Sequence, residues 1–306
     1  MREKYTLGIL LLLIIVTVII LNGDTQPWKL HVYTPNVLYE SRELLHRKRW
    51  EWFSIQDGSR TFYLPQKSHL IKGERAVMQL LQTLVCKNYD IVVDVGANIG
   101  HITLLLAARN CTTVAFELQI ACIDMLRASL RLNQMHADIL RRPISDKVGQ
   151  VIRLARETEC NGMYSTKWRG TEELTTTTLD AMFPEPTRIK LLKIDIEGHE
   201  LHALMGAVNL FSSRRVEMSI VESTWWPNYW NATGLKWAYN WLANLVYDNS
   251  YHIECIGSSV GGSIAGMRYD SKLAFLENYS FWINAKIVMT DGSSQRVIYC
   301  SEFTIS

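Results

Sequence analysis

The most constraining feature of this sequence is a series of short apolar runs that alternate with segments of helical apolar spacing. Runs typical of buried strands cover residues 89–94, 112–116, 189–194 and 216–221, with a further candidate at 139–144. Helical spacing covers residues 74–84, 101–108, 121–135 and 200–211. Strands that alternate with helices at this spacing predict an α/β fold with a doubly wound, mostly parallel sheet.

Acidic residues stand at the ends of four of these runs: Asp94 is the last residue of the first run, and Glu117, Asp195 and Glu222 directly follow the other three. In a doubly wound sheet, ligands bind at the carboxyl ends of the strands, near the point where the strand order reverses. The four acids therefore predict a ligand site at this edge of the sheet.

The turn after the first run, Asp94–Gly100, favours one kind of ligand. It contains neither the G-x-x-x-x-G-K-[ST] nor the G-x-G-x-x-G pattern, both of which hold phosphate. An acid that opens the turn suits a positively charged ligand, and Glu117 stands where a carboxylate can accept hydrogen bonds from ribose hydroxyls. A cationic, ribose-bearing cofactor without phosphate is S-adenosylmethionine. The alternative is a tight strand–helix turn that binds no ligand.

Several segments together resemble a known family. Val93–Thr103 and Ala115–Glu117 are similar to the first two motifs of class I, S-adenosylmethionine-dependent methyltransferases, and the segments 144–146, 178–180 and 191–200 narrow the resemblance to the FkbM-type methyltransferases. The resemblance covers about residues 74–222. It implies a Rossmann-like domain that transfers a methyl group, usually to a hydroxyl oxygen, and it leaves the acceptor open.

The resemblance also implies roles for individual residues. The contacts to the methionyl part of the cofactor would come from Asp94, Gly96, Asn98 and Gly100. Glu117 would hold the ribose, and Ser145 and Asp146 would border the adenine. The residues beside the transferring methyl group would be Lys193, Asp195, Glu197 and Glu200.

Methyl transfer to an alcohol needs a positioned base that removes the hydroxyl proton. We expect Asp195 to be this base, with Glu197 as the second candidate and His199 as the third. Alternation in a strand would put Asp195 and Glu197 on one face, where they could also hold a divalent metal ion through oxygen ligands. Whether they do is open, and no metal site is assigned. Helix capping is the alternative role for Glu197, and more so for Glu200.

Tryptophans follow the run that ends at Glu222. We expect Trp225 and Trp226, together with Lys193 and Glu222, to bind the acceptor, because indole faces stack on the apolar faces of sugars. The alternative for Trp225, Trp226 and Trp230 is core packing. Trp237 and Trp241, four residues apart on a predicted helix, are expected in the core.

An uncharged apolar run at residues 6–21 follows Arg2 and Lys4. Its length is at the short end for a helix that crosses a bilayer core of about 30 Å. With positive charges before it, the run predicts a type II anchor in the lipid bilayer and a catalytic domain in the lumen of the endoplasmic reticulum or Golgi. The alternative is a cleaved leader and a secreted protein.

The expected domains are an anchor at residues 1–22, a stem at 23–73, a methyltransferase domain at 74–250, and C-terminal strands at 251–306 that extend the sheet or form a small cap. The sequons at Asn110, Asn231 and Asn278 are compatible with a lumenal glycoprotein. Six cysteines permit disulfides, and the sequence does not choose their pairing.

Composition limits the function classes. The 32 Lys and Arg residues nearly balance the 30 Asp and Glu residues, which argues against a dedicated nucleic-acid binder. The sequence therefore predicts an O-methyltransferase that acts on a glycan or a small hydroxyl compound. A catalytically silent scaffold with the same fold is the alternative, and an NAD-linked oxidoreductase is disfavoured by the missing glycine pattern.

Overall fold

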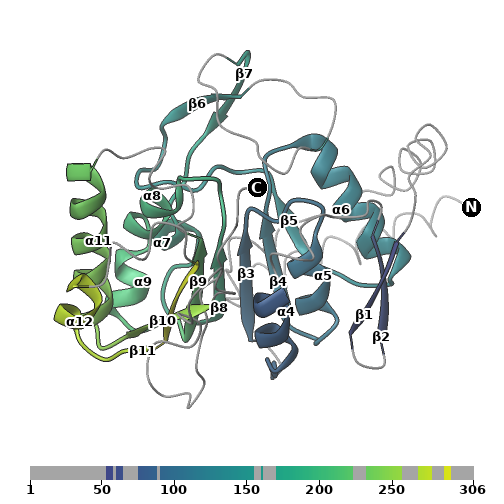
Figure 1. Cartoon of the computed structure of the whole chain (residues 1–306). Coiled ribbons are helices and arrows are strands. Elements are labelled where there is room, and N and C mark those ends of the chain that lie inside the picture. Colours follow the sequence, from purple (N-terminus) through teal and green to yellow (C-terminus); the bar gives the residue numbers. More distant parts are fainter. Residues whose placement is uncertain are drawn as a thin grey trace, which may run out of the picture. The chain divides into compact units, whose positions relative to one another are not determined.

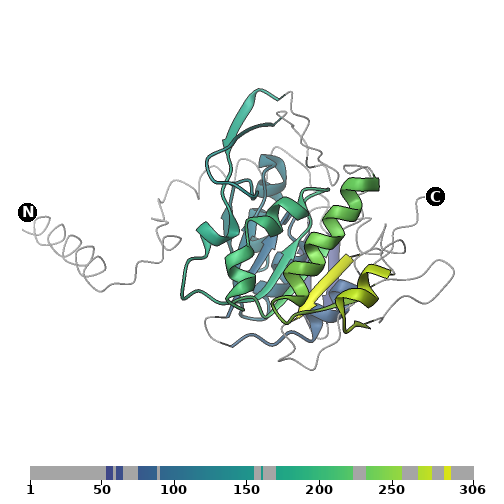
Figure 2. The same cartoon turned by 90° about the vertical axis from the view of Figure 1, so that its left-hand side faces the viewer.

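The buried strands of this chain form one large sheet in the computed structural model (Figures 1 and 2). The structure describes residues 53–57, 60–64, 75–87, 90–154, 160, 170–222, 232–256, 268–277 and 286–290. All of them belong to one unit, Leu44–Ser306. The apolar run predicted as an anchor and the tryptophans at 225, 226 and 230 lie outside the described residues.

The large sheet has eight strands in the order β11-β10-β12-β9-β8-β3-β4-β5. They are β3 (Ile91–Val95), β4 (Thr112–Phe116), β5 (Asp138–Leu140), β8 (Ile189–Ile194), β9 (Met218–Glu222), β10 (His252–Ile256), β11 (Arg268–Tyr269) and β12 (Lys286–Thr290). Strands β5, β4, β3, β8 and β9 are parallel, whereas β12, β10 and β11 join antiparallel. All five residues of β3 and of β9 are buried, which explains why both strands are mostly apolar.

The strand order reverses between β3 and β8. The chain runs from β3 outward to β4 and β5, and then returns to place β8 on the other side of β3. In such sheets the carboxyl ends of the two strands at the reversal diverge and leave a crevice for a ligand. The residues that follow β3 and β8 are therefore the ones that the topology brings to a site.

The described helices form two groups along the sheet (Figure 1). In the first group, α4 (Arg75–Gln82) packs against α5 (His101–Ala107), which is followed along the chain by α6 (Ile120–Leu132). In the second group, α9 (Val208–Ser212) contacts both α7 (Leu179–Met182) and α11 (Ala232–Tyr247), and α11 contacts α12 (Lys272–Glu277). None of the described helices is long and apolar enough to cross a membrane.

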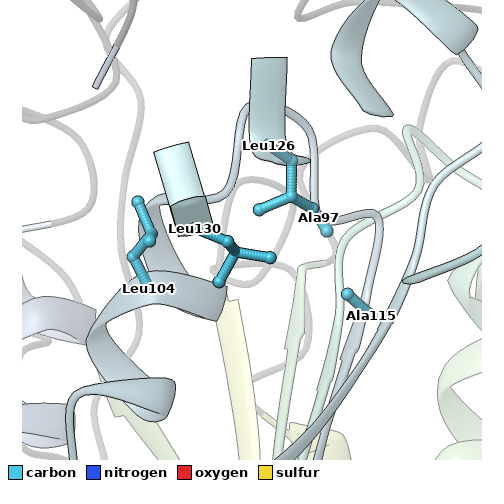
Figure 3. Close-up of a cluster of buried hydrophobic side chains, with 5 residues drawn as sticks. All are labelled: Ala97, Leu104, Ala115, Leu126 and Leu130. Atoms are coloured by element: carbon cyan, nitrogen blue, oxygen red, sulfur yellow. The ribbon is translucent and has the colours of Figure 1, made fainter. Parts of the chain in front are cut away.

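A cluster of buried side chains fixes the turn after β3 against α5 and α6 (Figure 3). Its members are Ala97, Leu104, Ala115, Leu126 and Leu130. A Cβ atom at Gly100 would lie 2.2 Å from Cδ1 of Leu126, so the small residue allows α6 to pack on the turn. The core therefore holds the turn in place against α5 and α6.

The segment predicted as one helix at residues 200–211 is two helices, α8 (Glu200–Met205) and α9. The break falls at Gly206, where a Cβ atom would lie 2.1 Å from the carbonyl oxygen of Ser145. The helical spacing in the sequence continues across the break, because both helices bury apolar residues.

The third strand is shorter than predicted. β5 ends at Leu140, and Ile144 makes an isolated bridge with Thr177. The strands β6 (Val151–Leu154) and β7 (Glu172–Thr175) lie between Ile144 and Thr177 in the sequence. They form a separate antiparallel pair that the sequence analysis did not predict. Apart from the buried Leu154, their residues alternate between exposed and partly buried, so neither strand shows a buried apolar run.

Part of the range predicted as a stem is folded. Strands β1 (Phe53–Asp57) and β2 (Arg60–Leu64) pair antiparallel. The backbone N–H of Tyr63 donates to Oδ1 of Asn133 at 2.9 Å, and Nδ2 of Asn133 donates to the Tyr63 carbonyl at 2.9 Å. These two bonds attach the hairpin to the end of α6.

Two disulfides link segments that are distant in the sequence. Cys86, after α4, pairs with Cys111, directly before β4, and Cys122 of α6 pairs with Cys160.

The expectation for Trp237 is wrong, because 47% of this residue is exposed. α11 buries a different face, which carries Ala238, Tyr239, Leu242 and Val246.

Candidate active site

A pocket lies at the carboxyl ends of β3, β4 and β8, where the strand order reverses. Most of the residues that the sequence analysis singled out line its wall, namely Gly96, Asn98, Glu117, Ser145, Lys193, Asp195, Glu197 and His199. These residues come from separate parts of the chain, and the parallel sheet brings them together because the strand ends meet at one edge.

The glycine turn forms one wall of the pocket. The backbone N–H groups of Gly96 and Ala97 both donate to the Phe116 carbonyl, at 2.9 and 3.0 Å, which ties the turn to the end of β4. Gly96 has a φ of 84°, and a Cβ atom there would lie 1.8 Å from the carbonyl oxygen of Asp195. Only glycine allows this close approach between the turn and the residue that follows β8.

Glu117 joins the ends of β3 and β4. Its Oε2 accepts the backbone N–H of Asn98 at 2.8 Å, and its Oε1 accepts those of Leu118 and Gln119, both at 2.8 Å. Burial raises the pKa of Glu117, although these hydrogen bonds and the Lys193 charge act in the opposite direction. The carboxylate lines the pocket and retains acceptor capacity for ligand hydroxyls, since its two oxygens together offer about four lone-pair sites.

A buried charge cluster lies beneath the turn. Nζ of Lys193 donates to the Gly96 carbonyl at 2.8 Å and lies 3.3 Å from Oδ1 of Asp94 and 3.6 Å from Oδ2 of Asp195. Asp94 is fully buried and also accepts a hydrogen bond from Thr103 Oγ1 at 2.6 Å. The cluster fixes the turn to β8, and the Lys193 ammonium is directed at these groups.

The segment that follows β8 is a turn and not a continued strand. β8 ends at Ile194, and Glu197 and Gly198 have φ values of 57° and 101°. The prediction that Asp195 and Glu197 share a face because they alternate along a strand is therefore wrong. Both residues nevertheless line the pocket, because the turn folds back toward the glycine turn.

His199 is the N-cap residue of α8 and lies on the pocket wall. Its ring stacks on that of His202, with the ring centroids 4.4 Å apart. Burial, with a further contribution from His202, lowers the pKa of His199 to about 4, while Asp146 acts in the opposite direction. His199 is therefore neutral at pH 7, in the form that can accept a proton.

Several predicted site residues are not on the wall of this pocket. Asp94 lies beneath it, Gly100 packs against α6, and Asp146 follows the lining residue Ser145. Glu222 is buried and borders a small separate cavity with Ile102 and Lys193. The expectations for Trp225 and Trp226 concern residues outside those that the structure describes.

The structure also adds lining residues that the sequence analysis missed, among them Gln119, Arg142, Arg153 and Thr176. Arg153 and Thr176 belong to the segment of β6 and β7, and Arg153 pairs with Glu173 at 2.8 Å. Their sequence carries no strand signal strong enough to place them at the pocket. Within the described ranges, no group of three or more His, Cys, Asp or Glu residues is placed to hold a metal ion.

The fold and the pocket define a parallel-sheet α/β domain of the methyltransferase type, with its ligand site at the reversal of strand order. The comparison with known families agrees with this class. The family model described as the methyltransferase FkbM domain matches residues 94–249, about half of the chain. The chain belongs to the FkbM methyltransferase family.

Among curated proteins, the chain is similar to the hexuronic acid methyltransferase AglP of Haloferax volcanii. The two are 27% identical over 154 residues, which cover 50% of this chain and 63% of that protein. The chain thus spans less than two thirds of the length of this relative.

Solved structures of methyltransferases are also similar to this chain, and two examples follow. A 16S rRNA N2 G1207 methyltransferase of T. thermophilus, in complex with AdoMet and guanosine, is 15% identical, with a TM-score of 0.33, over 57% of this chain and 42% of that one. The precorrin-6y C5,15-methyltransferase of Geobacter metallireducens GS-15 is 11% identical, with a TM-score of 0.38, over 76% of this chain and 95% of that one.

The cofactor implied by the family is S-adenosylmethionine, and the pocket residues fit it. Carboxylates of Glu117, Asp195 and Glu197 line the pocket, which suits a ligand with a sulfonium cation and ribose hydroxyls. Gly96 lets the turn pack directly on the Asp195 carbonyl, which keeps both segments at the pocket wall. Gly96 and Asn98 would border the cofactor, and Glu117 would face its ribose.

Proposed function

We propose that this chain is an S-adenosylmethionine-dependent O-methyltransferase that acts on a hydroxyl group of a glycan. The observation that carries the proposal is the position of Asp195, Glu197 and His199, which line the same pocket as the glycine turn and Glu117. Groups able to accept a proton thus stand at the cofactor site, as transfer to a hydroxyl requires.

The chemistry divides between cofactor and protein. The cofactor supplies an activated methyl group on a positively charged sulfur, so the protein's main tasks are alignment and the exclusion of water. Lys193 and Glu117 hold the walls of the pocket in place through the bonds described above. A carboxylate or imidazole at the end of β8 then takes the proton of the acceptor hydroxyl as the new bond forms.

Two observations support a glycan acceptor, and an acidic one in particular. The curated relative is named as a hexuronic acid methyltransferase. Arg142 and Arg153 line the pocket, and guanidinium groups pair well with carboxylates. We therefore propose a hexuronic acid unit, or a similar acidic sugar, as the first acceptor to test.

We further propose that the domain acts in the lumen of the secretory pathway. The disulfides Cys86–Cys111 and Cys122–Cys160 support this location, because such bonds persist mainly in oxidising compartments. The predicted anchor at residues 6–21 would hold the domain there.

The first experiment is a calorimetric titration of the purified protein with S-adenosylhomocysteine, followed by transfer of a labelled methyl group to oligosaccharides. We expect one-to-one binding, and transfer to an oligosaccharide that ends in glucuronic acid in preference to its glucose-terminated counterpart. Tight binding without transfer to any hydroxyl acceptor would favour the catalytically silent scaffold. A folded sample that does not bind would refute the proposed activity.

A further inference from the structure

A carboxylate outside the pocket wall organises the turn that follows β8. Glu200, the first residue of α8, is fully buried, and its side chain reaches back along the chain. Its Oε1 accepts the backbone N–H of Ile196 at 2.8 Å and that of Gly198 at 3.0 Å. The Gly198 amide belongs to the peptide bond that follows Glu197, and the Ile196 amide belongs to the peptide bond that follows Asp195. One oxygen atom therefore spans the turn from one end of the Ile196–Glu197 pair to the other.

Glu197 has a backbone conformation that needs such support. Its φ of 57° lies in the left-handed region, which residues with a side chain rarely adopt. A conformation of this kind persists only where the surrounding structure holds it, and it is common at functional sites. The two hydrogen bonds to Glu200 hold it here, and the Glu197 side chain lines the pocket.

Asp195 is held in a different way. Its backbone N–H donates to the Val95 carbonyl at 3.0 Å, which continues the ladder between β8 and β3. Its carboxylate forms an ion pair with the Lys193 ammonium, at 3.6 Å. The bond from Gly198 to Glu200 bears directly on Glu197. The bond from Ile196 adjoins Asp195, but the Asp195 amide and carboxylate have these partners of their own, which do not involve Glu200.

We propose that Glu200 is a positioning residue that holds Glu197 at the pocket, where Glu197 removes the proton of the acceptor hydroxyl. This inference rests on the proposed O-methyltransferase function. In the step, the acceptor oxygen forms a bond to the methyl carbon and the carbon–sulfur bond breaks with its electron pair going to sulfur. The hydroxyl proton passes to the Glu197 carboxylate.

The first test measures the turn itself and needs no acceptor. Amide hydrogen exchange is compared between the wild-type protein, Glu200→Ala and Glu200→Gln. We expect the amides of Ile196 and Gly198 to lose protection in Glu200→Ala and to keep it in Glu200→Gln, because the glutamine amide oxygen can accept the same bonds. Unchanged protection in Glu200→Ala would overturn the proposal.

The matched control is Asp180→Ala. The Asp180 carboxylate also accepts two backbone N–H groups, those of Asn209 at 3.0 Å and Leu210 at 2.8 Å, at the start of α9. It lies outside the pocket wall. We expect this variant to lose stability while the exchange of Ile196 and Gly198 and the turnover stay as in the wild type.

The second test is kinetic and uses the oligosaccharide identified in the transfer assay. A positioned base contributes about 10²–10⁴-fold, so we expect Glu200→Ala to lower kcat by about 100-fold while the dissociation constant of S-adenosylhomocysteine changes less than about threefold. Glu200→Gln should recover most of this loss. Glu200→Asp keeps the carboxyl group but withdraws its oxygen atoms from the two amides by the length of one methylene group. It is the variant to use if Glu200→Ala does not fold.

Double variants identify the residue through which Glu200 acts. If Glu200 acts through Glu197, then Glu197→Gln combined with Glu200→Ala should be no slower than Glu197→Gln alone. The losses from Asp195→Asn and Glu200→Ala should instead multiply. Multiplying losses with Glu197→Gln would refute the positioning role. Absence of methyl transfer in the wild type would refute the proposed function, while the exchange test would still decide whether Glu200 holds the turn.

Discussion

The close approach between the glycine turn and the end of β8 makes a sharp prediction for Gly96→Ala. Gly96 and Gly149 have nearly the same backbone conformation, with φ values of 84° and 85°. Their surroundings differ, because a Cβ atom at Gly96 would lie 1.8 Å from the Asp195 carbonyl oxygen, whereas at Gly149 nothing lies within 4 Å. Gly149→Ala is therefore a control for the backbone conformation alone.

The expected magnitudes follow from this difference. The left-handed conformation of an alanine costs about 1–2 kcal/mol in either variant. At Gly96 the new methyl group also displaces a backbone atom, and overpacking of this kind costs about 1–3 kcal/mol more. We expect Gly96→Ala to lower the free energy of unfolding by about 2–5 kcal/mol and Gly149→Ala by about 1–2 kcal/mol.

Urea unfolding measures the two losses, and calorimetric titration with S-adenosylhomocysteine measures the pocket. Since the turn and the end of β8 both line the pocket, Gly96→Ala should also weaken binding, while Gly149→Ala should not. If the two variants lose the same stability to within about 0.5 kcal/mol, a difference near the limit of such comparisons, the reasoning from the close approach fails.

Three further predictions concern the pocket and its support. Glu117→Ala should weaken S-adenosylhomocysteine binding by about 1.5–3 kcal/mol, through lost hydrogen bonds to a charged group, and an unchanged dissociation constant would count against its ribose role. Replacing Cys122 and Cys160 by serine should weaken binding in the same titration, because Sγ of Cys160 lies 3.4 Å from Oδ1 of Asn98 on the pocket wall. Loss of either disulfide should lower the free energy of unfolding by about 3–4 kcal/mol, through the loop that it closes. The control is the same replacement of Cys86 and Cys111, which should leave binding unchanged. Burial raises the pKa of Glu200 from 4.5 to about 7, so between these values the folded chain holds a proton that the unfolded chain has released. Stability should therefore fall by about 3 kcal/mol as pH rises from about 4.5 to about 7 and change no further above it, and urea unfolding of Glu200→Gln should lack this component.

The sequence by itself determined the parts of this protein that depend on local pattern. The apolar runs that became β3, β4, β8 and β9 are continuous because both faces of these strands are buried, so they could be recognised without neighbours. The acids that follow these strands and the glycine turn identified the ligand edge of the sheet, and the motifs around them identified the FkbM methyltransferase family.

Tertiary structure decided how the groups at that edge are used. Lys193 lines the pocket and is also a buried support, through contacts with Asp94 and Gly96 at the end of β3 and with Asp195 after β8. Its predicted acceptor contact stays a prediction. Glu197 faces the pocket through a left-handed turn that Glu200 holds, and no alternation pattern encodes such a turn. The pairing of Cys122 with Cys160 and the placement of Arg153 at the pocket likewise depend on segments that meet only in the fold. Spacing along a chain predicts which face of an element is buried, whereas the partner of a charged or polar side chain is set by what the other elements bring within a few ångströms of it.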